Sequence, residues 1–270
     1  MSVHSPAERR RELVALYRRL SEGHVCPLTA DRMRLVFGAG NADAELMFVG
    51  EAPGAEEDRQ GKPFVGRAGK LLDALLEEIG LQREDTFVAN VLKCRPPGNR
   101  DPLPEEIEEC SPWLFRQIEL IEPLVICTLG NFATKLLTGG KIGITKVHGS
   151  PQRHELGGRS IQLYPIFHPA AALRTEAVRE LLQADFARLP ALLEEARNSD
   201  RIEGRDEVAA PELGPGLPKS EPGAAAGGGS GADADADLGA PADAEAQVAK
   251  PGRPDTETAA ADRSQLDLFE

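Results

Sequence analysis

The sequence predicts an α/β fold in which helices cover both faces of a mainly parallel sheet. Four short apolar runs, at residues 45–49, 86–92, 124–128 and 161–167, have the length and composition of buried strands. Helical patterns lie between these runs, so strand and helix alternate along the chain. Right-handed crossovers would then place the four strands side by side, giving a three-layer αβα domain with a central four-stranded sheet.

The helices are predicted from apolar residues that recur every three or four positions. In chain order, such patterns span residues 8–22, 71–79, 104–121, 131–137 and about 175–196. The first is a charged amphipathic helix, and the third begins with a proline and two glutamates, residue types that favour a helix start. Residues 50–69 are rich in glycine and acids and read as an elaborated strand-to-helix loop.

The composition changes near Asn198 and divides the chain into one domain and a tail. From Arg201 onward there are 6 Lys or Arg and 15 Asp or Glu, so the tail carries −9 of the formal −13. We expect a domain at residues 1–198 and a disordered acidic linker rich in Ala, Gly and Pro at 199–264. The remaining charge of −4 neither requires nor excludes nucleic acid, since phosphate binding depends on a local basic face.

No apolar stretch is long enough to span a bilayer, and the first residues do not form an export signal. A cytoplasmic protein with reduced cysteines is therefore expected, and no membrane partner. For its four cysteines, metal or cluster ligation competes with simple burial, and disulfides rank last.

Each predicted strand runs into unusual residues at its carboxyl end: Gly50-Glu51, Asn90 to Cys94, Gly130-Asn131 and His168-Pro169. The carboxyl ends of parallel strands meet at one sheet edge, where ligands of open α/β sheets bind. Four elements thus deliver candidate residues to one place. This convergence predicts a functional site more strongly than any single motif does.

Each of these residues also has a structural interpretation. Glu51 is favoured for chemistry over helix capping, because other acids nearby are available as caps. Taken alone, Phe64 would be a core residue, and a lone histidine such as His168 is more often structural. Asn90 places an amide in a strand suited to burial, either to read the edge of a planar base or to satisfy a neighbouring loop.

Taken together, these segments resemble the family-4 uracil-DNA glycosylases, which carry an iron-sulfur cluster. The resemblance covers about residues 20–195. It rests on Gly50 to Gly54, Glu57-Asp58, Gly61 to Gly66, Asn90 to Pro97, Leu129-Gly130, Ile144 to Lys146 and His168 to Ala170. Several independent motifs in the same order are far more specific than one glycine pattern.

The resemblance implies an enzyme that starts base excision repair by hydrolysing uracil from DNA. A flipped-out uracil would stack on Phe64, and the amide of Asn90 would read its Watson-Crick edge. Glu51 would lie near the sugar and the attacking water, the backbone at Ala52 would help to hold the base, and His168 would hydrogen-bond a uracil oxygen. Glu57 is a second candidate for positioning water, or alternatively for excluding thymine.

The same resemblance assigns three cysteines to a 4Fe-4S cluster. Cys26, Cys94 and Cys110 match three of the four expected ligands, whereas Gly23 stands where the family has the fourth cysteine. His24 or a solvent species is a candidate fourth ligand, and a labile, three-iron or absent cluster is the alternative. Cys127, inside a predicted strand, is expected to be an ordinary buried residue.

Basic residues near the predicted edge are candidates for DNA contact. Lys146 and Arg174 are assigned to phosphates, together with Lys93, Arg95, Arg100 and His148. The segment from Pro169 to Arg174 resembles the loop that wedges into the duplex in the superfamily, with Leu173 as the plug. Its structural interpretation is a helix start.

The chain ends on an apolar peptide after the polar tail. Residues 265–270 include Gln265, Leu266, Leu268 and Phe269 and resemble the short peptide with which bacterial repair proteins bind the sliding clamp. A flexible linker would let this peptide dock without restricting the catalytic domain.

The sequence therefore predicts a monomeric, monofunctional uracil-DNA glycosylase. Three alternatives remain at this stage: an enzyme that removes a broader range of deaminated bases, a non-catalytic or covalent binder of uracil-DNA, and a nucleotide-binding protein that uses residues 50–54 as a phosphate loop. The acids around that loop disfavour the last of these.

Overall fold

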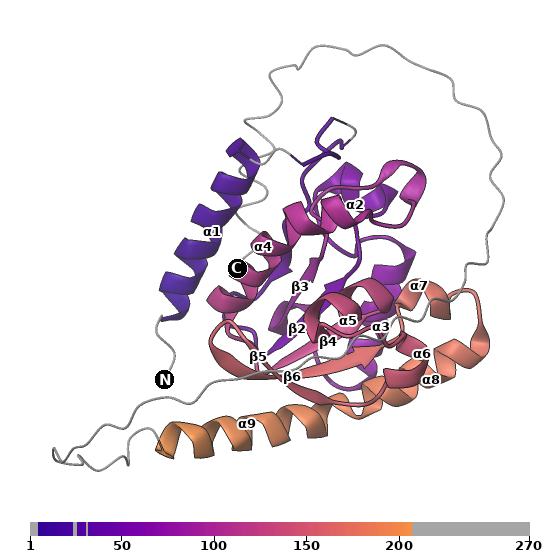
Figure 1. Ribbon diagram of the computed structural model, residues 1–270. Helices are drawn as coiled ribbons and strands as arrows, with labels where there is room; N and C mark the ends of the chain where they lie inside the picture. The colour runs from indigo at the N-terminus through magenta and orange to yellow at the C-terminus, as the bar shows by residue number, and fades with distance from the viewer. Residues whose placement is uncertain (1–4, 24–25, 31, 207–270) are drawn as a thin grey trace, which may run out of the picture.

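The computed structural model describes residues 5–23, 26–30 and 32–206, and Figure 1 shows their arrangement. The elements are α1 (Pro6–Gly23), β1 (Ala39–Gly40), β2 (Leu46–Gly50), α2 (Ala55–Gln60), α3 (Arg67–Glu78), η1 (Arg83–Asp85), β3 (Thr86–Asn90), η2 (Pro97–Asn99), α4 (Pro104–Ile121), β4 (Val125–Leu129), α5 (Asn131–Thr138), α6 (Ile144–Val147), β5 (Gln152–Leu156), β6 (Arg159–Ile166), α7 (Pro169–Ala172), α8 (Glu176–Ala187) and α9 (Leu189–Asp206). Those labelled η are short 3-10 helices.

Within the described residues, six strands form one sheet in the order β1-β3-β2-β4-β6-β5. The inner four, β3, β2, β4 and β6, are parallel, while β1 and β5 pair antiparallel at the two edges. The predicted parallel core of four strands is confirmed. The sequence pattern misses the edge strands because β1 has only two residues and β5, Gln-Arg-His-Glu-Leu, is mostly polar.

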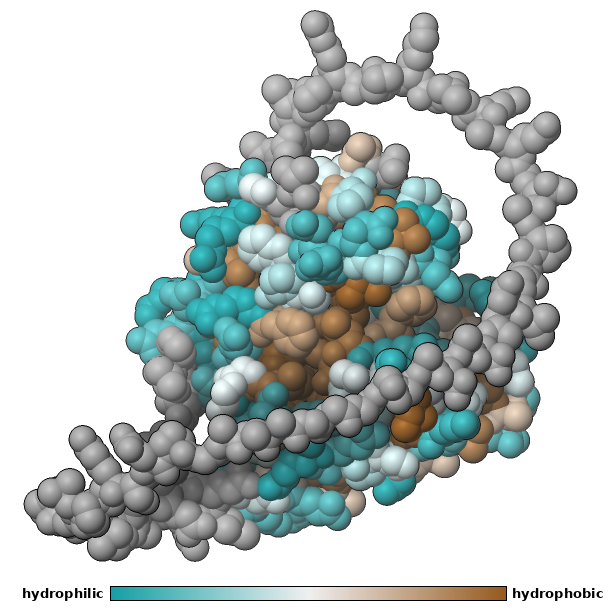
Figure 2. All heavy atoms as spheres, viewed as in Figure 1, coloured by the Kyte–Doolittle hydropathy of each residue, from teal (hydrophilic) through white to brown (hydrophobic). Residues whose placement is uncertain are grey.

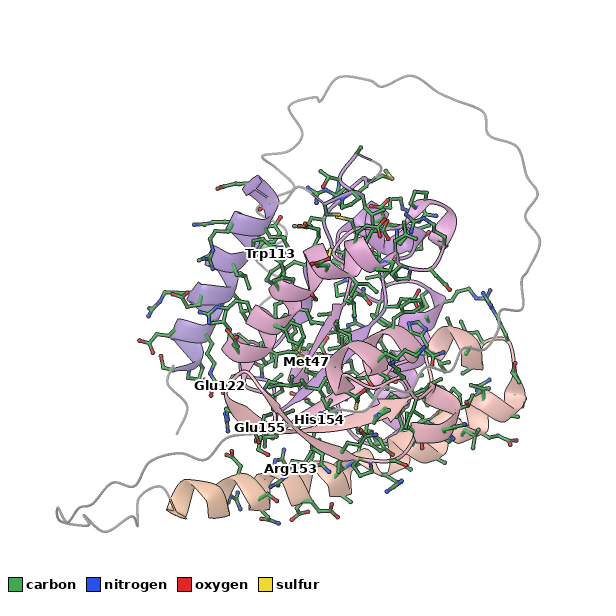
Figure 3. All side chains as sticks on the ribbon, in the orientation of Figure 1. Met47, Trp113, Glu122, Arg153, His154 and Glu155 are labelled. Atoms are coloured by element: carbon green, nitrogen blue, oxygen red, sulfur yellow. The ribbon has the colours of Figure 1, made fainter. Side chains whose placement is uncertain are left out.

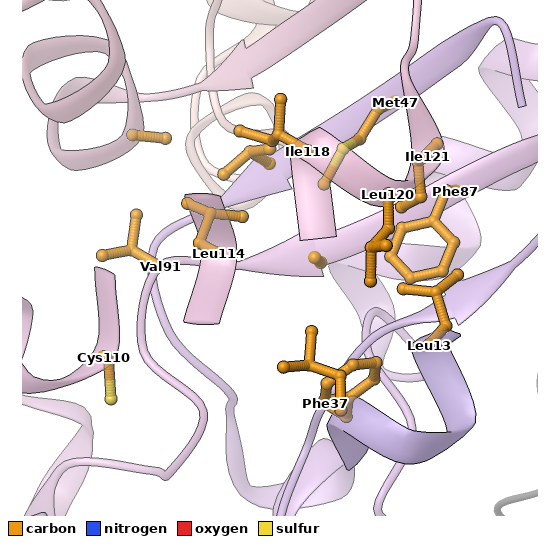
Figure 4. Packing of buried hydrophobic residues seen from close by; sticks show 14 of the residues in the cluster. Leu13, Phe37, Met47, Phe87, Val91, Cys110, Leu114, Ile118, Leu120 and Ile121 are labelled. Carbon is orange, nitrogen blue, oxygen red and sulfur yellow. The ribbon is translucent and has the colours of Figure 1, made fainter. Parts of the chain in front are cut away.

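Alternate side chains of the inner strands face two separate hydrophobic cores. Met47 belongs to the first, which also contains Leu13 of α1 and Ile118 of α4. Figure 4 shows part of this core, with Ile118 beside Met47. Leu46 and Phe48 belong to the second core, formed with α3, α8 and α9. Since helices pack on both faces of the sheet (Figure 1), the three-layer αβα architecture is confirmed.

The helices differ from the predicted pattern at several points, of which three have a clear bearing on the chain's organisation. The helix predicted over residues 175–196 is divided into α8 and α9, because Pro190 lacks the N–H that would continue the hydrogen-bond ladder to Phe186. A short helix, α2, lies inside the predicted loop and ends at Gly61, whose φ of 72° is left-handed. Finally, α9 continues to Asp206, past the predicted domain end at 198.

Several predictions concern residues outside the described ranges. These are His24, most of the linker at 199–264, and the terminal peptide at 265–270. Within the described ranges, no helix combines the length and apolar character needed to cross a membrane. Figure 2 shows mostly hydrophilic residues on the face seen there, with hydrophobic residues gathered near its centre beside α5.

Candidate active site

The parallel register of β2 and β3 brings Gly50 and Asn90 together at the carboxyl edge of the sheet. These two residues are paired at the ends of their strands. A Cβ atom on Gly50 would lie 2.4 Å from Asn90 Oδ1 and 2.6 Å from the ring of Phe64. Because real Cβ atoms do not approach other atoms so closely, only glycine allows this amide and this ring to meet here. Segments far apart in the chain converge as predicted.

The side-chain carbonyl of Asn90 is buried without a partner. The residue is 2% exposed, and among the described residues nothing hydrogen-bonds its Oδ1. Leaving a buried acceptor unsatisfied costs about 1–3 kcal/mol, so native structures rarely keep one without a reason. A ligand that donates an N–H to this oxygen would remove that cost.

Phe64 lies beside Asn90 in a strained backbone conformation. Its φ is 52°, in the left-handed region that non-glycine residues seldom adopt, while its side chain is buried. The centre of its ring is 5.6 Å from that of His168, with the two planes tilted by 34°. The ring of Phe64 therefore lies close to His168, which follows β6, although β6 and β3 are at opposite ends of the four parallel strands.

His168 presents a neutral imidazole to this site. Its Nδ1 accepts a hydrogen bond from the backbone N–H of Ala170 at 3.1 Å, so the ring proton must be on Nε2. Burial lowers the pKa of His168 to about 4. At neutral pH the side chain is thus an uncharged donor through Nε2. A Cβ on Gly130 would come within 3.2 Å of the histidine Cβ, which places the β4–α5 turn against it.

Glu51 is the acid of the site that titrates near neutrality. It directly follows β2 and is half-buried. Burial, and secondarily the negative charge of Asp101, raises the pKa of Glu51 to about 7. Sequence reasoning missed Asp101, an exposed residue in the loop before α4, because nothing in its local pattern connects it with Glu51. The neighbouring Ala52 packs against the first core.

The other acids of the loop hold backbone amides. Glu57 Oε1 accepts from the N–H groups of Val65 and Gly66 at 3.0 and 2.8 Å. Asp58 is buried, and its Oδ1 accepts from the amides of Met33 and Arg34. The role of Glu57 beside the base stays a prediction, and the contacts that the structure shows for it brace the loop that carries Phe64.

Lys93 does not face solvent, so its prediction as a phosphate contact is wrong. Its side chain is fully buried, and Nζ donates to the backbone oxygen of Asn90 at 2.8 Å and to Gln117 Oε1 at 2.7 Å. Burial lowers the pKa of Lys93 to about 7. From the sequence alone, a lysine just after a strand is expected to be exposed to solvent. Here its side chain is instead buried, between neighbours that belong to the first core.

Three predicted DNA-binding residues are exposed at the carboxyl edge. Lys146 lies in α6, whose start is tied to the start of α5 by the Ile144 amide donating to Asn131 Oδ1 at 2.8 Å. Leu173, 39% exposed, and Arg174 follow α7. An exposed leucine flanked by a cation, beside His168, is compatible with the predicted wedge.

Two further candidates for phosphate contact have carboxylate partners instead. Arg100 Nη1 donates to Glu106 Oε2 at 2.9 Å. His148 Nδ1 is 3.0 Å from Asp185 Oδ2, and its ring lies 4.5 Å from that of Phe167. Both side chains therefore take part in contacts that hold the loops of this edge in place.

Three cysteines from separate segments come together beside the first core. Cys26, Cys94 and Cys110 are buried, and none forms a disulfide. Hydrogen bonding to Cys26, followed by burial, raises the pKa of Cys94 and of Cys110. Arg32 donates to Cys94 Sγ at 3.2 Å, and the Leu28 amide donates to Cys26 Sγ at 3.3 Å.

This donor set fits an iron-sulfur cluster in chemistry, because thiolates and N–H donors to sulfur are what such clusters use. Across the described ranges, no three His, Cys, Asp or Glu side chains are arranged ready to hold a metal ion. The candidate fourth ligand, His24, lies outside those ranges. Cys127 is buried in β4 within the second core, as predicted.

A cavity of about 1480 Å³ lies at the opposite, amino-terminal edge of the sheet. Its lining includes Glu122 at the end of α4 and Arg153 and Glu155 of β5, which Figure 3 labels near that edge. Glu122 Oε2 is paired with Arg9 at 3.0 Å and with Arg159 at 2.8 Å. These opposing charges satisfy one another, whereas Asn90 at the carboxyl edge has an unused acceptor. The carboxyl edge is therefore the better candidate.

The chain is similar to proteins of known function. The family model of the uracil DNA glycosylase superfamily matches residues 37–189, which include Glu51, Phe64, Asn90 and His168. A type-4 uracil-DNA glycosylase of Archaeoglobus fulgidus is 46% identical over 168 residues, covering 61% of this chain and 84% of the relative. A protein of the same name from Saccharolobus solfataricus is 49% identical, and the match covers 61% of this chain and 78% of the relative. Another from Thermotoga maritima is 48% identical, and the match covers 62% of this chain and 87% of the relative.

The protonation state of His168 can be tested directly. We expect ¹⁵N NMR of the imidazole to show the proton on Nε2 at neutral pH and a titration midpoint near 4, because burial disfavours the charged ring. A His168→Asn variant assigns the signal. A midpoint at the ordinary value of 6.5 would contradict the buried, neutral assignment.

Proposed function

The chain belongs to the type-4 family of the uracil-DNA glycosylase superfamily, and from this premise we propose that it hydrolyses the N-glycosidic bond of uracil in DNA. This reaction starts base excision repair. The observation that carries the proposal is the buried, unpaired Oδ1 of Asn90 beside the ring of Phe64. An extruded pyrimidine with a flat face and an N–H on its pairing edge satisfies both groups.

Uracil matches this pair of groups better than cytosine does. Uracil N3–H donates to Asn90 Oδ1 and uracil O4 accepts from Asn90 Nδ2, whereas cytosine has an acceptor at N3 and a donor at N4. Phe64 supplies the stacking face for the extruded ring. Because the amide is buried, a base with the reversed pattern leaves unsatisfied groups in the pocket, which disfavours its binding.

His168 stabilises the leaving group. When the bond between C1′ and N1 breaks, its electron pair stays on the base, and uracil departs as an anion. The neutral His168 donates Nε2–H to a uracil oxygen as negative charge develops there. An imidazole with a pKa of about 4 acts as a hydrogen-bond donor at neutral pH without carrying charge.

Glu51 acts on the sugar and on the attacking water. As the base leaves, the sugar gains positive charge, which the Glu51 carboxylate stabilises, and this carboxylate accepts a proton from the water whose oxygen bonds to C1′. A pKa of about 7 leaves a large fraction of Glu51 ionised at neutral pH and makes it a stronger base than an ordinary glutamate.

The remaining residues of the edge are proposed to bind the substrate around this centre. The backbone at Ala52 holds the base, and Glu57 maintains the loop that carries Phe64. Lys146 and Arg174 bind phosphates that flank the extruded nucleotide, and Leu173 fills the space that it leaves in the duplex.

Replacing Glu51 with Gln tests the central role. We expect single-turnover uracil release to fall by about 10²- to 10⁴-fold, because the amide cannot accept the proton. In the unmodified protein, log(kcat/KM) should rise with pH up to about 7 and then level off, since only the carboxylate is active, and the variant should lack this limb. Affinity for abasic DNA should change little, and full retained turnover would remove Glu51 from the role.

We propose that Cys26, Cys94 and Cys110 hold a 4Fe-4S cluster, with His24 or a solvent species on the fourth iron. The cluster would tie the segment around Cys26 to the segments around Cys94 and Cys110, a structural role outside the hydrolytic steps. The convergence of three buried thiols supports this proposal.

Metal analysis checks the cluster. We expect the purified chain to contain iron and acid-labile sulfide and to absorb visible light, and Cys94→Ala to lose all three and to unfold at lower temperature. Cys127→Ala is the matched control, because this cysteine is buried in the second core and should leave the iron content unchanged. Equal iron in both variants would contradict the ligand assignment.

We also propose that residues 265–270 recruit the enzyme, acting as a monomer, to the bacterial sliding clamp. The proposal rests on the apolar peptide at the end of the acidic tail. Removing these six residues should abolish clamp binding in a pull-down or by surface plasmon resonance, while uracil release from a short oligonucleotide stays unchanged. Unchanged clamp binding after the truncation would refute the recruitment role.

A further inference from the structure

We infer that Arg83 is a positioning residue that fixes the ring of Phe64 for stacking on the base, an inference that rests on the proposed function. Arg83 begins the short 3-10 helix η1, before β3, and is partly buried. Its Nη2 donates to the backbone oxygen of Pro63 at 2.6 Å and its Nη1 to that of Phe64 at 3.2 Å. One guanidinium thus binds two consecutive carbonyls of the base-stacking loop.

The same guanidinium is held by a carboxylate. Arg83 Nη1 also lies 2.8 Å from Asp73 Oδ1 of α3, and the two side chains are 24% and 39% exposed. Asp73 therefore fixes the orientation of the Arg83 guanidinium, whose N–H groups also donate to the carbonyls of Pro63 and Phe64. A planar guanidinium with several donors suits this arrangement better than the single ammonium of lysine.

A carboxylate holds the other side of the loop. Where Arg83 binds the carbonyls of Pro63 and Phe64, Glu57 Oε1 binds the amides of Val65 and Gly66. Four successive residues are thus fixed through their main-chain groups, by a cation at the carbonyls and an anion at the amides. Side chains from α2 and η1 thus hold the backbone of this loop from two sides.

The strained backbone of Phe64 explains why such support is needed. A left-handed φ of 52° is strained for a residue with a side chain, and it persists only where the surroundings determine it. Gly69 contributes as well, because a Cβ at that position would lie 1.7 Å from the Phe64 carbonyl oxygen. Without Arg83, the peptide at 63–64 can relax, and the ring would leave its place against Gly50 and Asn90.

Four variants test the inference by single-turnover uracil release. In Arg83→Met we expect a rate lower by about 100-fold, because small displacements of a positioning group have effects of that size. Arg83→Lys, which keeps the charge and one donor, should recover part of the rate, and Asp73→Asn should lie between Arg83→Lys and the unmodified protein. Arg197→Met is the matched control, since Arg197 pairs with Glu45 at the opposite edge of the sheet, and it should keep the rate within about 2-fold.

A second readout separates positioning from general folding. Inhibition by free uracil, which needs the stacking ring, should weaken about 10-fold or more in Arg83→Met, while affinity for abasic DNA, which has no base to stack, should stay within about 2-fold. Melting temperatures of all variants define a common temperature at which each is folded. At that temperature, parallel losses of uracil inhibition and abasic-DNA affinity would show a merely structural role and overturn the inference.

The same measurements distinguish failure of the Arg83 role from failure of the proposed glycosylase activity. If the unmodified protein releases uracil and Arg83→Met releases it at the same rate with unchanged uracil inhibition, the positioning role is wrong and the proposed function stands. If the unmodified protein releases no uracil, both are overturned.

Discussion

The site depends on the close approach of two parallel strands at a point where one of them, β2, carries no side chain. Gly50 ends β2 directly opposite Asn90 at the end of β3, and any Cβ at 50 would collide with both the amide and the ring of Phe64. The register of the sheet therefore determines the shape of the base pocket. Strand pairing of this kind is fixed by burial on both faces, so the pocket inherits the rigidity of the core.

Burial also shifts the pKa values of the two side chains to which we assign the chemistry, and it acts oppositely on them. It lowers the pKa of His168 to about 4 and raises the pKa of Glu51 to about 7, in each case by disfavouring the charged form. One buried edge of the sheet thus holds a neutral imidazole and a carboxyl group that titrates near neutrality, as the proposed roles of His168 and Glu51 require. Asp101 adds to the effect on Glu51 through its charge, which links Glu51 to the loop before α4.

The sequence was sufficient for the parallel core and for the residues that follow its strands, because apolar runs and the polar residues after them are local patterns. It did not predict β5, whose polar residues reflect an edge position, or the break between α8 and α9, which depends on Pro190 within a continuous apolar periodicity. The burial of Lys93 and the support from Arg83 depend on contacts between distant segments. No local pattern encodes them.

The misassigned Lys93 also shows how the base pocket and the cysteine region form one structural unit. Its Nζ holds the backbone carbonyl of Asn90, while its backbone N–H hydrogen-bonds Cys110 and the next residue is Cys94. Gln117 of α4 completes the connection by accepting from Lys93 and donating to the Phe37 carbonyl. Asn90 and the cysteine region are therefore connected through the buried contacts of Lys93. A change at the cysteines would therefore reach the backbone of Asn90 through the contacts of a single lysine.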